Sequence, residues 1–295
     1  IRSRQLAGIN GLALHLLEAG FDDPARPLLL LLHGFPELAY SWRRVMPALA
    51  AAGYHVAAPD QRGYGRTTGW DPDYDGDLAS YHLLNLARDA LGLVRALGHE
   101  AVDLAGHDFG AWVAGWCALV RPDVFRSVAF MSAPFTGPPG LAPTAPDPIH
   151  DALAALPRPR KHYQSYYGTR EAACDMTDCA QGLHAFLRAY FHMKSADWAQ
   201  NRPHPLASWT APELAKMPTY YVMDLHETMA QTVAHEMPSP EAIAACRWLT
   251  EKALAGYAAE FGPTGLQGGL PWYRARSAPG LSRQFDLYAG RRIHV

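Results

Sequence analysis

One stretch decides how this sequence folds: residues 104–111, which read LAGHDFGA. Gly106 and Gly110 lie two positions before and after Asp108, directly between an apolar run and a helical pattern. A tight turn from a buried strand into a helix needs small residues at those two positions, because the backbone is crowded and the central side chain is forced outward. The stretch therefore predicts a strand-to-helix elbow that presents Asp108 to a ligand.

The carboxylate of Asp108 sets the chemistry that such an elbow can do. At a helix N-terminus a carboxylate stays ionised and receives backbone N–H groups. It can attack carbon in an alkylating step and form an ester without first losing a proton. Taken alone, Asp108 is better explained as a helix N-cap, because Asp is a common cap. The choice between the two roles depends on the rest of the sequence.

Alternating strands and helices surround the elbow. Apolar runs predict strands at residues 28–32, 55–58, 102–105 and 128–131, and helical spacing predicts helices at 42–52, 83–97 and 111–120. This order favours an α/β fold with a mainly parallel sheet and helices on both faces. From residue 135 the character changes to a proline-rich stretch and then helical patterns. We expect a core at 1–134, an inserted helical cap at 135–276 and an incomplete return to the core at 277–295.

Composition narrows the class of ligand. The 295 residues carry 26 Lys plus Arg against 28 Asp plus Glu, so the formal net charge of −2 gives no long-range attraction for nucleic acid or anionic lipid. The longest strongly apolar run, residues 109–120, is too short to span a bilayer. Four cysteines without a CxxC spacing favour free thiols and a cytoplasmic location. Many arginines beside few lysines favour a bacterial source, and a homodimer is left open.

Two further loops lie near the elbow in the predicted topology. Residues 33–37 read HGFPE and follow the leucine strand, and residues 60–65 read DQRGYG after the next strand. Parallel neighbours bring the first loop and the elbow to the same edge of the sheet. Backbone N–H groups of that loop and of Phe109 can then converge on a developing oxyanion, where one donor is typically worth about 10²–10³ in rate.

With these three loops in this order and spacing, the sequence resembles the α/β-hydrolases, and among them the soluble epoxide hydrolases. The resemblance runs from about Gly11 to the end of the chain and includes the cap. It implies an α/β-hydrolase fold and conversion of a small apolar epoxide and water to a diol, with no metal or organic cofactor. Phe35 and Phe109 would supply the oxyanion N–H groups. The supporting residues would be His33, Pro36 (in a cis peptide bond) and His107.

Two tyrosines complete the resemblance. Residues 161–164 read KHYQ and residues 271–274 read PWYR, which makes Tyr163 and Tyr273 the pair that hydrogen-bonds the epoxide oxygen. Ring opening generates an alkoxide, and a phenol with an unperturbed pKa of about 10 can donate a proton to it. The family usually has Asn where this sequence has Pro271. Tyr166 and Tyr167 lie close to the first motif, so the choice of Tyr163 depends on alignment.

Other activities use the same nucleophile. Haloalkane dehalogenases bind halide with Trp after the nucleophile and Asn after His-Gly, whereas this chain has Phe109 and Phe35 there. Fluoroacetate dehalogenases have Arg after the nucleophile. Dehalogenation of a small haloalkane or haloacid is nevertheless the enzymatic alternative. A hydrolase-fold protein that binds a ligand without turnover is the alternative from another class.

The base and acid that would hydrolyse the ester are not recognisable in the sequence. In this superfamily the order is nucleophile, acid, histidine. After Asp108, every histidine except His294 falls in the proline-rich stretch or the predicted cap, and residues 133–140 contain no Asp or Glu. A partial sequence, a truncated chain and a loss of turnover would each explain this. We expect this chain to form the ester but not to release diol, and to leave an apolar sheet edge unpaired.

Overall fold

The computed structural model describes residues 1–141, 147–278 and 280–294. Its contacts divide the chain into two compact units. The first, here called the core unit, comprises Ile1–Ala142 and Pro271–Val295, and the second, the helical unit, comprises Pro143–Leu270. Part of the proline-rich stretch, residues 142–146, lies outside the described residues.

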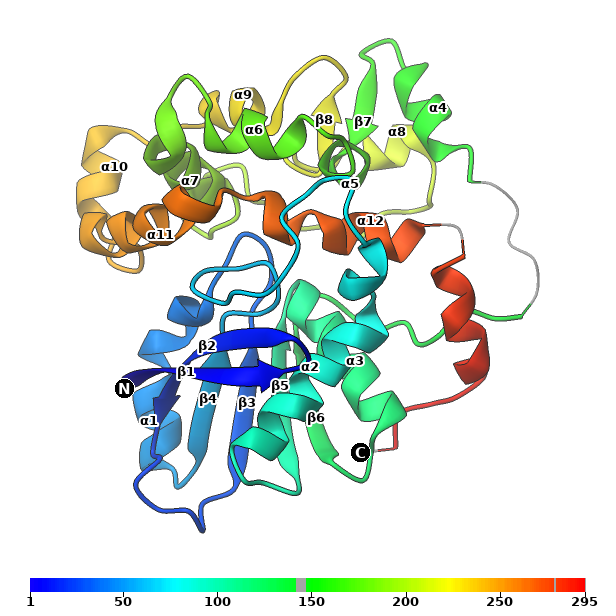
Figure 1. The fold of residues 1–295 in the computed structure, drawn as a ribbon. Coiled ribbons are helices and arrows are strands. Elements are labelled where there is room, and N and C mark those ends of the chain that lie inside the picture. Colours follow the sequence, from blue (N-terminus) through cyan, green and yellow to red (C-terminus); the bar gives the residue numbers. More distant parts are fainter. Residues whose placement is uncertain (142–146, 279, 295) are drawn as a thin grey trace. The chain divides into compact units, whose positions relative to one another are not determined.

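The core unit is built on one six-stranded sheet in the order β1-β2-β4-β3-β5-β6 (Figure 1). The strands are β1 (Arg2–Ile9), β2 (Leu12–Ala19), β3 (Leu28–Leu32), β4 (His55–Pro59), β5 (Val102–His107) and β6 (Phe125–Met131). The last four in spatial order pair in parallel, and β1 and β2 pair antiparallel. The predicted mainly parallel sheet is confirmed, and β1 and β2 are additional to the prediction.

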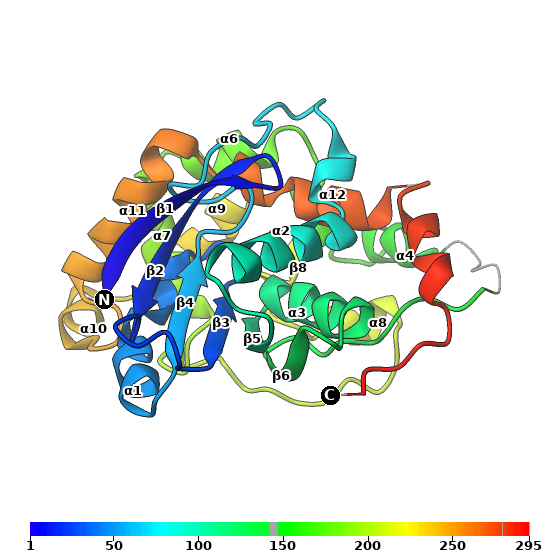
Figure 2. The same ribbon diagram turned by 60° about the horizontal axis from the view of Figure 1, so that its bottom comes forward.

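Helices cover both faces of this sheet. On one face Leu31 and Val56 pack against Trp42 and Met46, which belong to the 3-10 helix η1 (Ala39–Arg44) and to α1 (Met46–Ala51). On the other face lie α2 (Leu83–Ala96) and α3 (Phe109–Val120) (Figures 1 and 2). The continuous helix predicted at 42–52 is wrong, because α1 starts only at Met46, with a proline in its first turn.

The elements that complete the core unit come from distant parts of the sequence. They are the 3-10 helix η2 (Leu78–Tyr81), α12 (Pro271–Ser277) and the 3-10 helix η4 (Ser282–Tyr288). The expected insertion boundaries of 135 and 276 differ from the observed division. Phe135 packs edge-on against Trp116 of α3, and Trp272 of α12 donates a hydrogen bond to the Arg62 carbonyl oxygen. Both residues therefore group with the core unit.

The outer strand β6 has an exposed apolar edge. Among the described residues it pairs on one side only, with β5. Phe130 and Met131 are 40% and 45% exposed. Strands of a parallel sheet are normally buried on both faces, so apolar side chains this exposed on β6 are unusual. The unpaired edge of β6 is also open to pairing with another strand.

The helical unit contains short helices and one small sheet. Its elements are α4 (Ile149–Ala154), β7 (Arg160–His162), α5 (Tyr163–Tyr167), α6 (Ala172–Thr177), α7 (Gly182–Met193), α8 (Ala211–Leu214), β8 (Val222–Asp224), α9 (Met229–Ala234), α10 (Pro240–Ala245), α11 (Glu251–Thr264) and η3 (Gln267–Gly269). Helix α10 begins at Pro240, with Ser239 as its N-cap. Helix α11 continues through Pro263 to Thr264 and is followed by Gly265 at φ +63°. The two-stranded sheet β7-β8 was not predicted, because its strands have only three residues each.

Candidate active site

The elbow between β5 and α3 holds Asp108 in an unusual backbone conformation. Its φ of 54° and ψ of −123° are strained for a residue with a side chain. The flanking glycines make the turn possible. A Cβ atom on Gly106 would lie 2.3 Å from the Gly110 carbonyl oxygen, and one on Gly110 would lie 2.3 Å from the Leu32 carbonyl oxygen. The predicted crowding is therefore present on both sides of Asp108.

The Asp108 side chain does not cap its own helix. It forms no capping hydrogen bond with the first turn of α3. Instead its Oδ1 atom accepts a hydrogen bond from the Phe35 backbone N–H at 3.2 Å. This contact argues against a role as an N-cap and connects the carboxylate to the loop expected to stabilise an oxyanion.

The loop at residues 33–37 approaches the elbow closely. Its Phe35–Pro36 peptide bond is cis, as the resemblance implied. A Cβ atom on Gly34 would lie 2.4 Å from both Cβ and Oδ1 of Asp108. Only a glycine fits between this loop and the carboxylate without displacing one of them.

A carboxylate–imidazole pair lies beside the elbow. Glu37 Oε2 is 2.9 Å from His107 Nδ1, and the Gly34 N–H also donates to this carboxylate at 3.4 Å. Burial alone would raise the pKa of Glu37, but the hydrogen bond and charge of His107 outweigh it and lower the pKa. His107 was expected as a supporting residue, whereas Glu37 was not singled out. Its position in the quoted HGFPE stretch, next to the cis proline, was the available signal.

His33 joins the two loops that follow β3 and β4. The ring is buried, with Nδ1 2.9 Å from the Gly34 carbonyl oxygen, while Nε2 accepts the Gln61 backbone N–H at 3.1 Å. The Gln61 side-chain amide donates to the His33 carbonyl oxygen at 2.6 Å. Because Nε2 accepts, Nδ1 is the nitrogen that carries the proton and the ring is neutral. Burial accordingly lowers the pKa of His33.

The buried His33 gives the stability of the fold a pH dependence. Its pKa in the folded protein lies below the ordinary value of 6.5. Its contribution is therefore complete above that value and is lost as the pH falls from there through the folded pKa. We expect the free energy of unfolding to decrease between about pH 7 and about pH 5, and to decrease less in a His33→Gln variant. Urea unfolding at both pH values measures this.

The exposed His204 provides the matched control. In a His204→Gln variant the free energy of unfolding should decrease with falling pH as much as it does in the parent protein. An unchanged slope in His33→Gln would show that other groups carry the pH dependence.

Tyr273 lies beside both residues expected to form the oxyanion hole. Its ring packs edge-on against Phe35 at 5.9 Å and against Phe109 at 5.2 Å between centroids, and it is 8% exposed. The neighbouring Trp272 fixes α12 here, since its Nε1 donates to the Arg62 carbonyl oxygen at 3.0 Å. The structure thus brings Tyr273 together with Phe35, Phe109 and the elbow.

Tyr163 lies in the helical unit, at the start of α5. Its backbone N–H donates to the Tyr221 carbonyl oxygen at 2.8 Å, and its hydroxyl oxygen accepts from the Gln164 amide at 3.1 Å. Tyr166 donates its hydroxyl to Asp175, and the Tyr167 hydroxyl hydrogen-bonds that of Tyr190. The Tyr163 hydroxyl oxygen thus accepts a hydrogen bond from its neighbour Gln164, whereas the Tyr166 hydroxyl donates to Asp175.

The structure offers few other groups for acid–base or metal chemistry. C-terminal to Asp108 in the sequence, the only histidine in the described part of the core unit is His294. It is exposed and lies after η4 in a segment that is neither helix nor strand. The described residues contain no cluster of three or more His, Cys, Asp or Glu that could hold a metal ion. They also contain no helix long and apolar enough to cross a membrane.

Known proteins resemble this chain in sequence and in structure. Residues 27–216 match the family model described as the alpha/beta hydrolase fold. Epoxide hydrolase A of Mycobacterium tuberculosis is 33% identical over 275 residues, covering 92% of this chain and 73% of that protein. An epoxide hydrolase of Caballeronia sordidicola is 32% identical, covering 90% and 68%.

Solved structures agree with the sequence relatives. Epoxide hydrolase A from Mycobacterium thermoresistibile superposes with a TM-score of 0.68 at 31% identity, covering 97% of this chain and 76% of that one. Epoxide hydrolase I of potato (Solanum tuberosum) has a TM-score of 0.68 at 28% identity, covering 98% and 76%.

Proposed function

Because this chain belongs to the epoxide hydrolase branch of the α/β-hydrolase family, we propose that it opens a small apolar epoxide with Asp108 as the nucleophile. The observation that carries the proposal is the Asp108 carboxylate, which is presented by a strained elbow and held by the Phe35 N–H instead of its own helix. Such a carboxylate is positioned by the loop and free of a capping role, which suits it to nucleophilic attack on carbon.

The reaction proceeds through a covalent ester. With Oδ1 held by the Phe35 N–H, Oδ2 attacks an epoxide carbon. The carbon–oxygen bond of the ring breaks as the ester forms, and the ring oxygen becomes an alkoxide that takes a proton from a tyrosine. When water attacks the ester carbonyl carbon, it gives up a proton, through solvent, to the deprotonated tyrosine, and the N–H groups of Phe35 and Phe109 stabilise the resulting oxyanion, each worth about 10²–10³ in rate. The bond from the carbonyl carbon to the alkyl oxygen then breaks, which releases the diol and restores the Asp108 carboxylate.

Tyr163 and Tyr273 donate to the departing ring oxygen. We expect Tyr163→Phe and Tyr273→Phe each to slow ester formation by about a hundredfold, because the alkoxide loses a proton donor. Stopped-flow fluorescence with a single turnover of styrene oxide measures this rate.

The matched control is Tyr166→Phe, since the Tyr166 hydroxyl is bound to Asp175 inside the helical unit. It should leave the rate unchanged. A loss in Tyr166→Phe together with a normal rate in Tyr163→Phe would transfer the role from Tyr163 to Tyr166.

We also propose that the protein works in the cytoplasm. All four cysteines, Cys117, Cys174, Cys179 and Cys246, are free thiols. Free thiols are typical of reducing compartments. Fractionation of the source cells, with the protein detected by antibody, tests this location.

The proposed reaction is tested by incubating the protein with styrene oxide and measuring epoxide loss, diol and intact protein mass. Epoxide loss accompanied by diol, or by a protein adduct of one epoxide, supports the proposal. Halide release from a bromoalkane that is faster than any epoxide loss would replace it with dehalogenation. Reversible binding of the epoxide with neither product would favour a binding protein.

A further inference from the structure

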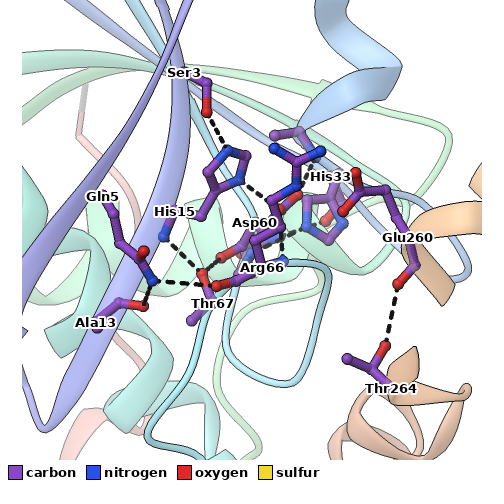
Figure 3. Close-up of polar contacts among 12 residues, drawn as sticks. Ser3, Gln5, Ala13, His15, His33, Asp60, Arg66, Thr67, Glu260 and Thr264 are labelled. Atoms are coloured by element: carbon purple, nitrogen blue, oxygen red, sulfur yellow. Dashed lines mark hydrogen bonds and ion pairs between the residues drawn. The ribbon is translucent and has the colours of Figure 1, made fainter. Parts of the chain in front are cut away.

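A hydrogen-bonded chain of Ser, His and Asp lies in the core unit away from β5. The Ser3 Oγ atom is 2.8 Å from His15 Nε2, and His15 Nδ1 is 2.7 Å from Asp60 Oδ2 (Figure 3). Ser3 is on β1, His15 is on β2, and Asp60 directly follows β4. In the sheet order, β3 lies between the strands of these residues and β5 with its elbow. The proposed epoxide chemistry uses none of the three.

Strand pairing places the first two members side by side. In the antiparallel pair of β1 and β2, Ser3 is opposite Leu17 and Gln5 is opposite His15. Ser3 and His15 are therefore diagonal neighbours on the same face. The His15 backbone is held as well, because its N–H donates to Thr67 Oγ1 and its carbonyl oxygen accepts from the Asp60 N–H.

The surroundings of Asp60 fix which nitrogen of His15 carries the proton. Asp60 is 3% exposed, and its carboxylate also accepts the backbone N–H groups of Ala39 at 2.9 Å and Arg66 at 3.1 Å. Burial alone would raise the pKa of Asp60, but the hydrogen bonds that its carboxylate accepts, that of His15 first, outweigh it and lower the pKa. An ionised carboxylate only accepts hydrogen bonds, so Nδ1 of His15 must donate. The tautomer with its proton on Nδ1 leaves Nε2 as an acceptor for the Ser3 hydroxyl.

These three residues have the roles of nucleophile, base and orienting acid. The geometry meets the test by which such sets are recognised, namely a nucleophile–base and a base–acid hydrogen bond. Ser3 is exposed, while His15 and Asp60 are buried. The hydroxyl is accordingly the member that an outside reagent can reach.

We propose that Ser3 is an activated surface nucleophile that accepts an acyl group from an activated ester. The Ser3 Oγ atom attacks the carbonyl carbon while its proton passes to His15 Nε2. The bond from that carbon to the leaving oxygen then breaks, the leaving group departs as an alkoxide or phenolate, and His15 returns the proton to solvent. The product is an ester on Ser3.

The chain contains an internal control. Ser127 is also an exposed strand serine with a carboxylate partner, since its Oγ donates to Asp103 at 2.7 Å, but the hydrogen bond goes directly to the carboxylate instead of to an imidazole. Comparing the two serines within one sample exposes both to the same reagent and the same folded protein.

The experiment is peptide mapping of the protein after short treatment with p-nitrophenyl acetate, in an Asp108→Asn background that removes the other nucleophile. We expect Ser3 to be acetylated about a hundredfold faster than Ser127, the usual contribution of a positioned base. His15→Gln, checked for folding by circular dichroism, should lower the Ser3 rate to that of Ser127. Equal rates at the two serines, or an unchanged Ser3 rate in folded His15→Gln, would overturn the proposal.

Discussion

Replacing Asp108 by Asn should slow epoxide consumption by about a thousandfold or more, because a neutral amide is a far weaker nucleophile than a carboxylate. The substitution keeps the shape of the side chain. It also suits the backbone, since Asn is among the residues that best tolerate the positive φ of 54° at this position. The loss should therefore appear in the reaction rate, measured by gas chromatography of the remaining epoxide, and not in the urea midpoint.

Asp103→Asn is the matched control for this variant. Asp103 lies on the same strand, β5, and its carboxylate contacts the surface residue Ser127. This variant should retain the parent rate. If Asp108→Asn kept more than about a tenth of the parent rate, Asp108 could not be the nucleophile.

Gly110→Ala should damage both the fold and the reaction. Its new Cβ atom would lie 2.3 Å from the Leu32 carbonyl oxygen and 2.6 Å from the His33 carbonyl oxygen. Both are backbone atoms, so the elbow and the loop at residues 33–37 must move apart. We expect a loss of about 3 kcal/mol in the free energy of unfolding, as in strong overpacking. A displacement of about 1 Å at a reacting group also costs about 10²-fold in rate.

Gly262→Ala provides the comparison, because Gly262 lies in α11 and a Cβ atom there meets nothing within 4 Å. It should leave the reaction unchanged and change the free energy of unfolding by less than about 1 kcal/mol, since Pro263 disfavours helical backbone at a preceding alanine and offsets the helix preference of that alanine. Urea unfolding and epoxide consumption of both variants test the pair. A Gly110→Ala protein as stable and as active as Gly262→Ala would show that the elbow and the loop are not tightly packed.

The central strands and the elbow could be predicted from the sequence because their signals are local. The five leucines of β3 and the small residues around Asp108 lie within a few positions of one another. β1 could not be predicted in the same way. Its side chains are almost all exposed, so it carries no apolar signal and depends on pairing with β2.

The boundaries of the core unit depend on contacts between distant residues. Trp272 joins this unit because its indole N–H reaches the Arg62 carbonyl oxygen, 210 positions away in sequence. The helical pattern around Trp272 indicates the local structure but gives no sign of its contact with Arg62. From the sequence alone, α12 is therefore grouped with the helices that precede it in the chain.

The candidate site was predictable where a motif carries it. Asp108, Phe35 and Tyr273 all lie in quoted motifs, and the structure places the last two in ring contact. The pairing of Glu37 with His107 joins residues 70 positions apart, and that of His15 with Asp60 joins residues 45 positions apart. Spacing gives no sign of such pairs, since they arise only when the strands align.

The ester on Asp108 is the central claim, and rapid acid quenching followed by peptide mapping tests it most directly. Protein mixed with styrene oxide in excess is quenched within the first turnover, digested and analysed by mass spectrometry. The account predicts that the peptide containing Asp108 gains the mass of one whole epoxide molecule and that Asp108→Asn shows no such gain. Diol formation with no modified peptide, or an adduct on another residue, would contradict it.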